Sequence, residues 1–172
     1  MGGQQRIYKQ RIASTMTLAK VFRAMEMIAA SRIGAARRAA TEAGPYEKAL
    51  TQAVAAVAIH TDLDHPLTRE RADTTRVAVL VVASDRGMAG AYAATILRES
   101  EKLIADLESG GYEPVIYTFG RRAAAYFRFR SVPIERAWEG ESDAPTIETT
   151  REVAAELLGR FLDKDPASGV GS

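Results

Sequence analysis

Apolar side chains in the first forty residues fall into two rows at helical spacing. One row has the three- and four-residue spacing of a coiled-coil seam and is continued by alanines: Leu18, Val21, Met25, Ile28, Ala35 and Ala39. The second row follows another side of the same predicted helix: Ile12, Met16, Ala19, Met27, Ala30 and Ile33. No proline precedes residue 45, and strong helix formers dominate. The pattern predicts a long helix that needs a partner, because an isolated helix cannot bury two apolar rows.

Gly44 and Pro45 interrupt this pattern, and helical spacing resumes over residues 46–59. Two arrangements remain open: one helix that kinks at Pro45, or a second helix that has Pro45 in its first turn. A continuous helix would be roughly 80 Å long, far longer than a small domain is wide. We assign residues 1–59 to a long N-terminal helix and residues 60–75 to a polar linker.

Four potential metal ligands lie close together in this linker: His60, Asp62, Asp64 and His65. Histidine nitrogens and aspartate oxygens can bind Zn²⁺. Turn-forming residues in a solvated loop explain the same cluster, and no other candidate ligand converges on it. We therefore predict no metal site.

Strand and helix patterns alternate from residue 76 to residue 162. The predicted strands are 76–83, 114–119 and 132–137, the third weakened by Pro133, and the predicted helices are 91–107, 121–129 and 146–162. This alternation predicts an α/β domain over residues 76–172, with a parallel sheet between flanking helices. Three strands are fewer than the usual four to six, so we expect the domain to be incomplete and the chain to be a fragment.

Helical spacing also predicts which side chains of the two longer helices face the core. In the first these are Ile96, Leu97, Leu103, Ile104 and Leu107. In the last these are Ile147, Val153, Ala154, Leu157, Leu158 and Phe161.

Charge is unevenly distributed along the chain. Residues 1–41 hold eight basic side chains and one acid, a net charge of +7, whereas the 172-residue chain is +1 in total. Such a helix could bind nucleic acid phosphates, but the basic residues alternate with apolar rows and lack an aromatic series, which favours a protein partner. No apolar run approaches the roughly 20 residues of a membrane span.

A short turn between the first strand and the next helix occupies the position where doubly wound folds bind phosphates. The chain carries neither a dinucleotide fingerprint nor a P-loop there. No histidine lies near Ser84 in sequence, so we predict no catalytic residue and no cofactor. We interpret the turn as structural; its candidate residues are Ser84, Asp85, Arg86, Gly87 and Gly90.

The run from Lys20 to Arg32, K-V-F-R-A-M-E-M-I-A-A-S-R, resembles the N-terminal helix signature K-I-T-K-A-M-E-M-V-A-A-S-K of the gamma subunit of rotary ATP synthases. Pro45-Tyr46 and His65-Pro66 also resemble that family. The turn from Ser84 to Gly90 resembles the family pattern S/T-D-R-G-L-x-G-G, from which this sequence departs at Ala91.

The resemblance implies a non-catalytic central-stalk subunit with a Rossmann-like α/β domain and no cofactor. It implies that the long helix pairs with a C-terminal helix inside the ring of alpha and beta subunits. The α/β domain would contact the epsilon subunit and the membrane rotor ring of c subunits at the cytoplasmic face of the cell membrane, with membrane association through partners only. The implied partner contacts are Lys20, Arg23, Met25, Glu26, Met27, Ile28 and Arg32.

One alternative interpretation belongs to a different functional class. The chain would then be a small nucleotide- or ligand-binding α/β protein in which the long helix serves as a dimerisation arm. Saturable ligand binding near residues 84–90 would distinguish it from a stalk subunit.

Overall fold

The computed structural model describes residues 2–60, 66–68, 71–87 and 89–171 of the chain. The chain divides into two compact units, Met1–Leu63 and Asp64–Ser172, and each is described by itself. The first contains one helix, α1 (Gly2–His60). The second begins with a short 3₁₀ helix, Pro66–Thr68, and continues as an α/β domain.

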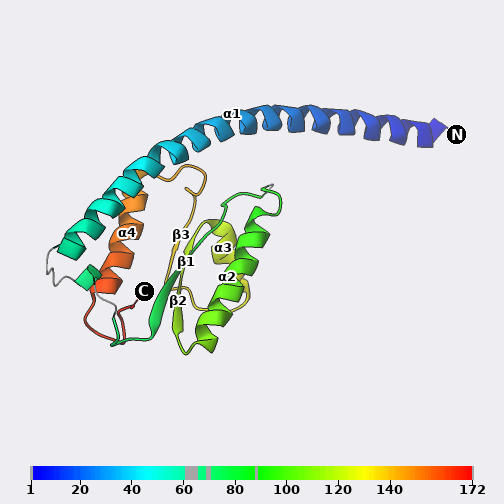
Figure 1. Ribbon diagram of the computed structural model, residues 1–172. Coiled ribbons are helices and arrows are strands. Elements are labelled where there is room, and N and C mark those ends of the chain that lie inside the picture. The colour runs from blue at the N-terminus through cyan, green and yellow to red at the C-terminus, as the bar shows by residue number, and fades with distance from the viewer. Residues whose placement is uncertain (1, 61–65, 69–70, 88, 172) are drawn as a thin grey trace. The chain divides into compact units, whose positions relative to one another are not determined.

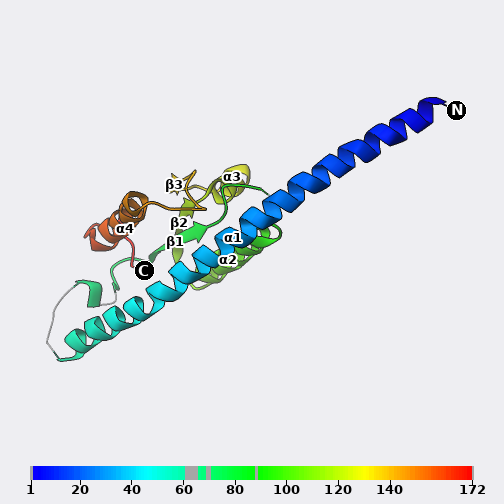
Figure 2. The same cartoon turned by 90° about the horizontal axis from the view of Figure 1, so that it is seen from above.

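Helix α1 runs through Pro45 without a break, which resolves the two arrangements that the sequence left open. Its 59 residues correspond to roughly 90 Å at the rise of an α-helix. Figures 1 and 2 show one continuous helix, and Figure 1 shows that it curves gently along its length. Pro45 offers no N–H to the carbonyl of Thr41, and the Thr41 hydroxyl donates to the carbonyl of Arg37 at 2.8 Å. Both features favour bending of a helix in this region.

The α/β domain is built on a three-stranded parallel sheet in the order β1-β2-β3. The strands are β1 (Arg76–Val82), β2 (Glu113–Phe119) and β3 (Arg136–Trp138), and the helices are α2 (Tyr92–Ser109), α3 (Arg121–Phe129) and α4 (Ile147–Leu162). The predicted α/β class with flanking helices is confirmed, and most element boundaries differ from prediction by one or two residues.

Helices cover both faces of this sheet, as Figure 1 shows. Helices α2 and α3 pack on one face around Val79, Val81 and Phe127. Helix α4 packs on the other face around Tyr117 and Trp138. Two right-handed crossovers in the same direction along the sheet place α2 and α3 on a common face. Helix α4 lies on the other face, and the segment after it returns to β1. There the Gly171 N–H donates to the Arg76 carbonyl at 2.8 Å.

The third strand is shorter and later than the predicted range of 132–137. Pro133 has no N–H for a sheet hydrogen bond. The Val132 N–H donates instead to the carbonyl of Phe127 at 3.0 Å, which completes the turn at the end of α3. Pairing therefore begins at Arg136 and ends at Trp138.

Four side chains that were predicted to face the core are exposed: Leu103, Ile147, Ala154 and Leu158. The core-facing side of α2 is narrower than predicted and consists of Ile96, Leu97, Ile104 and Leu107. Helix α4 contacts the sheet mainly through Val153, Leu157 and Phe161. Helical spacing identified the buried faces but overestimated their width.

Candidate functional site

The surface of α1 is exposed along its whole described length. Every residue between positions 3 and 57 is exposed, except for Gly34 and Gly44, which are half-buried. The exposed set includes both apolar rows that the sequence identified, for example Met25 at 45% and Met27 at 71% exposure. Water-exposed apolar side chains on this scale mark an interaction surface.

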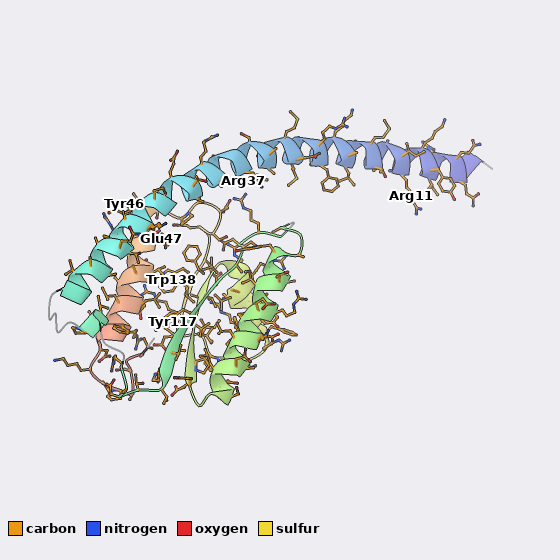
Figure 3. The ribbon with its side chains drawn as sticks, in the orientation of Figure 1. Arg11, Arg37, Tyr46, Glu47, Tyr117 and Trp138 are labelled. Carbon is orange, nitrogen blue, oxygen red and sulfur yellow. The ribbon has the colours of Figure 1, made fainter. Side chains whose placement is uncertain are left out.

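The predicted contact residues lie within one stretch of α1, from Lys20 to Arg32. Met25 and Ile28 belong to the first apolar row, and Met27 belongs to the second, on another side of the helix. Glu26 is the only acid among the first 41 residues. Figure 3 shows the side chains of α1 projecting on all sides of the helix, with Arg11 and Arg37 labelled. A helix with charged and apolar groups on several sides can contact more than one partner at once.

Asp85 lies at the centre of the turn that follows β1. Its Oδ1 accepts hydrogen bonds from the backbone N–H of Arg121 at 2.8 Å and of Gly140 at 2.7 Å, and its Oδ2 accepts one from the N–H of Ser142 at 2.7 Å. The Asp85 N–H donates to the Ser142 hydroxyl at 2.7 Å. One carboxylate thereby joins the end of β1 to the start of α3 and to the loop after β3.

Hydrogen bonding determines the charge state of Asp85. Partial burial raises the pKa of this carboxyl, but hydrogen bonds from Gly140, Ser142 and Arg121 outweigh it and hold that pKa well below its usual range. Asp85 is therefore ionised at neutral pH.

Gly120 allows two backbone segments near Asp85 to approach each other closely. Its φ of 101° is unfavourable for other residues, and a Cβ here would lie 2.0 Å from the carbonyl oxygen of Ala83. The Gly120 N–H donates to the Trp138 carbonyl at 2.7 Å, and the Ala83 N–H donates to the Phe119 carbonyl at 2.8 Å. The carboxyl ends of the three strands are connected at this point.

The remaining candidate residues of the turn, Ser84, Arg86, Gly87 and Gly90, line a common cleft but make different local contacts. Arg86 forms an ion pair with Asp143 at 3.5 Å. The Ser84 hydroxyl oxygen is buried without a hydrogen-bond partner in the described residues. Gly90 has a positive φ of 57°, and a Cβ at Gly87 would approach the Arg122 guanidinium to 2.9 Å. Asp85 is thus the only one of the five that receives hydrogen bonds from several distant segments.

The histidines of the linker lie apart from this turn in sequence, and most of the four potential metal ligands of the linker lie outside the described residues. His60 ends α1, whereas Asp62, Asp64 and His65 are not described. Within the described ranges, no group of three or more His, Asp or Glu side chains could hold a metal ion.

Arg71 has a structural role that sequence reasoning missed. Its guanidinium donates to the carbonyl oxygens of Phe161, at 2.9 Å, and Asp163, both at the end of α4, and it forms an ion pair with Asp73 at 2.7 Å. Gly169 provides the space, because a Cβ there would lie 2.7 Å from this guanidinium. A single arginine in a polar linker gives no sequence signal, since its partners are about ninety residues away.

We expect the substitution of Arg71 by alanine to lower the free energy of unfolding of the α/β domain by about 2–3 kcal/mol. The side chain is only 12% exposed, and its loss leaves carbonyls at the end of α4 without their donor. Urea unfolding followed by the fluorescence of Trp138, the one tryptophan of the sequence, measures this change. Arg151→Ala, on the exposed surface of α4, is the control and should change the value by less than about 0.5 kcal/mol. Equal effects of the two variants would contradict the role of Arg71.

Two further arginines, Arg136 and Arg160, attach α4 to the sheet. Arg136 on β3 forms ion pairs with Glu152 and Glu156, and Arg160 pairs with Glu156 and Glu135. The Arg136 guanidinium also lies over the Trp138 ring, 5.1 Å from its centre. Figure 3 shows Tyr117 and Trp138 in the interior of the domain, and their stacked ring centres are 6.3 Å apart. These contacts stabilise the domain and provide no catalytic arrangement.

Comparison with known proteins finds the same family by a sequence profile and by individual relatives. The sequence profile of the ATP synthase family matches residues 4–168. Over 170 residues, 99% of this chain, the sequence is 58% identical to the ATP synthase gamma chain of Beutenbergia cavernae and 48% identical to that of Acidothermus cellulolyticus. It is 44% identical over 168 residues to the gamma chain of Bifidobacterium adolescentis.

The aligned region covers 57% of the Beutenbergia and Acidothermus proteins and 55% of the Bifidobacterium protein. The chain therefore spans little more than half the length of these curated relatives. Among the described residues, no helix combines the length and the hydrophobicity that crossing a bilayer requires.

Proposed function

The chain belongs to the ATP synthase gamma family, and from this membership we propose that it acts in the central-stalk rotor of a proton-translocating ATP synthase. It transmits rotation between a proton-driven membrane ring and the catalytic nucleotide-binding subunits. The observation that carries the proposal is α1, which presents basic and apolar side chains to solvent along a helix of 59 residues.

The first apolar row of α1 supports pairing with a second helix. Leu18, Val21, Met25 and Ile28 have coiled-coil spacing and are all exposed. Such a seam is stable only when a partner helix covers it. In the proposed rotor the partner is a C-terminal helix of the gamma subunit, and the pair forms an asymmetric shaft.

The remaining surface of α1 supports contact with the catalytic ring of alpha and beta subunits. Lys20, Arg23 and Arg32 supply positive charge, and Met27 belongs to an adaptable apolar row. An asymmetric shaft contacts each catalytic site differently, so its angle changes the relative stability of the conformations of each site. Rotation then carries every site through different nucleotide affinities, while the nucleotides themselves are bound by the other subunits.

The α/β domain has its own partners in the proposed rotor. We assign it to contacts with the epsilon subunit and with the membrane ring of c subunits. The chain then lies at the cytoplasmic face of the cell membrane as a peripheral protein that is held there by its partners. The hydrogen bonds of Asp85 and Arg71 join distant segments of this domain, which suits a domain that must resist deformation while it transmits torque.

We expect Arg23→Glu to weaken the coupling between ATP hydrolysis and proton pumping in the assembled complex. Reversing a charge that faces an acidic surface replaces attraction by repulsion, and a loss of about 1–2 kcal/mol corresponds to a factor of about 5–30. Membrane vesicles measure the effect as the ratio of ATP-driven proton uptake to ATP hydrolysis, which should fall about fivefold.

Lys48→Glu, at an exposed position of α1 beyond Pro45, is the matched control and should leave the ratio within about twofold. Unchanged coupling in the Arg23 variant, in a complex of normal composition, would count against the proposed role of this helix. Saturable nucleotide binding by the isolated chain would support the ligand-binding alternative instead.

A further inference from the structure

A cleft of about 560 Å³ opens on the α/β domain beside the end of β1, between α2 and α3. It is hollow because three of the residues that line it, Ala93, Ala94 and Ala125, have short side chains. Leu97, 8% exposed, forms part of its floor, and Phe129, 89% exposed, lies at its edge. An open apolar cleft beside a fully exposed aromatic ring is typical of a protein-binding surface.

The charges around the cleft are unbalanced. Arg86 is paired with Asp143, and Glu101 is paired with Arg130 at 2.8 Å. Arg98 and Arg122 also line the cleft, and neither forms an ion pair within the part of the domain that the structure describes, residues 71–87 and 89–171. The positive charges of Arg98 on α2 and Arg122 on α3 therefore remain uncompensated.

The charged donors of the cleft are suited to carboxylates. Phosphates are commonly bound by free backbone N–H groups at the start of a helix. At the start of α3 the first two of these groups are occupied, because the Arg121 N–H donates to Asp85 and the Arg122 N–H donates to the Ser84 carbonyl at 3.1 Å. Among the described residues of the cleft, the charged groups without an ion pair are the guanidinium groups of Arg98 and Arg122, and guanidinium binds planar carboxylates through paired hydrogen bonds.

We propose that this cleft binds an acidic peptide segment of a protein partner. Two carboxylates of the segment pair with Arg98 and Arg122, and an apolar side chain between them fills the space above the alanines and packs on Phe129. The inference goes beyond the proposed rotor function and does not depend on it, since every residue in it belongs to the α/β domain.

Site-specific photo-crosslinking in the native organism tests this proposal. The complete natural protein is produced with p-benzoylphenylalanine in place of Phe129, irradiated in cells, and the cross-linked peptide is identified by mass spectrometry. The expected product joins position 129 to one protein segment that contains at least two acidic residues and an apolar residue. The same photo-reactive residue at Tyr112, which is 50% exposed between α2 and β2, is the control and should not capture that segment.

Charge reversal shows whether the captured segment occupies the cleft. Arg98→Glu combined with Arg122→Glu should lower the yield of this cross-link by about tenfold or more. The matched double variant, Arg151→Glu with Lys164→Glu, changes two exposed positions outside the cleft and should keep the yield within about twofold. Exchanging the two acids of the captured segment for lysine should restore the cross-link in the cleft variant. Near-wild-type Trp138 fluorescence identifies variants that have folded.

The outcomes separate this proposal from the rotor function. A basic captured segment, no cross-link at position 129, or a yield unaffected by the cleft charges would overturn the docking proposal. Saturable binding of ATP that requires Arg98 and Arg122 would also overturn it and assign the cleft to a nucleotide. A charge-dependent cross-link to a protein outside the ATP synthase would support the docking site and count against the rotor.

Discussion

Replacing Asp85 by alanine is expected to lower the free energy of unfolding of the α/β domain by about 3–5 kcal/mol. The carboxylate accepts three backbone hydrogen bonds, from Arg121, Gly140 and Ser142. Each hydrogen bond to a charged acceptor contributes about 1.5–3 kcal/mol, and the exposed donors recover part of that from water. The substitution also separates three segments that no other described side chain joins in this way.

Asp85→Asn isolates the contribution of the charge. Asparagine has the same shape, but its amide group cannot accept from both Oδ positions, so at least one backbone N–H loses its partner. We expect a loss of about 2–4 kcal/mol for this variant. Asp106→Asn, at an exposed position of α2, is the control and should change the value by less than about 0.5 kcal/mol. A loss below about 1 kcal/mol in urea unfolding of Asp85→Asn would show that the turn does not hold these segments together.

Lowering the pH should reduce the stabilisation that Asp85 gives to the folded domain. The pKa of Asp85 is lowered by folding, so its stabilisation is complete above the pKa of an unfolded aspartate, near 3.8, and declines as pH falls below that value. The stability difference between the natural protein and Asp85→Asn should therefore be constant from pH 7 to pH 5 and smaller at pH 3. A difference that stays constant down to pH 3 would contradict the charge-based explanation.

Introducing two acids into the first apolar row of α1 should abolish assembly of the rotor. In the proposed shaft Val21 and Met25 lie in the seam against a second helix, and burying an unpaired carboxylate there costs several kcal/mol. For the double variant Val21→Glu with Met25→Glu, we expect the recovery of intact complex to fall by at least about a hundredfold. Native gels and ATP hydrolysis assays of purified membranes measure the recovery.

Ala13→Glu with Ser31→Glu is the matched control for that experiment. It adds the same two charges to α1 but outside both apolar rows. The complex should assemble at near-normal yield, because these positions need not lie in the seam. Equal losses in the two double variants would indicate that α1 tolerates no added acid, and the spacing of the apolar row would then carry no information about its partner.

Local patterns predicted most elements of the fold. The apolar, β-branched run over residues 76–83 identified β1, and helical spacing identified α2 and α4, because these signals depend on neighbouring residues. The continuous helix through Pro45 was one of two open arrangements. A proline in a helix lowers stability by only a few kcal/mol, so the surrounding helical sequence can override it.

The contacts that organise the α/β domain could not be predicted in this way. The turn that contains Asp85 was interpreted as structural, but its sequence could not identify the partners Arg121 and Gly140, which are 36 and 55 residues away. Arg71 reaches carbonyl groups about ninety residues further along the chain. Such contacts depend on how strands and helices are placed by the whole fold. Four turn residues that the sequence singled out line the cleft between α2 and α3, but its alanines resemble ordinary helix residues in the sequence and gave no sign of a hollow there.

Direct observation of rotation is the measurement that tests the rotor proposal most directly. These 172 residues contain no cysteine, so Lys102→Cys on the exposed surface of α2 adds a single attachment point within them for a gold particle. The complex is fixed to a surface through its catalytic subunits and supplied with ATP. The proposal predicts rotation in one direction that stops when ATP is removed. A particle that only fluctuates about a fixed position while the same complexes hydrolyse ATP would contradict it.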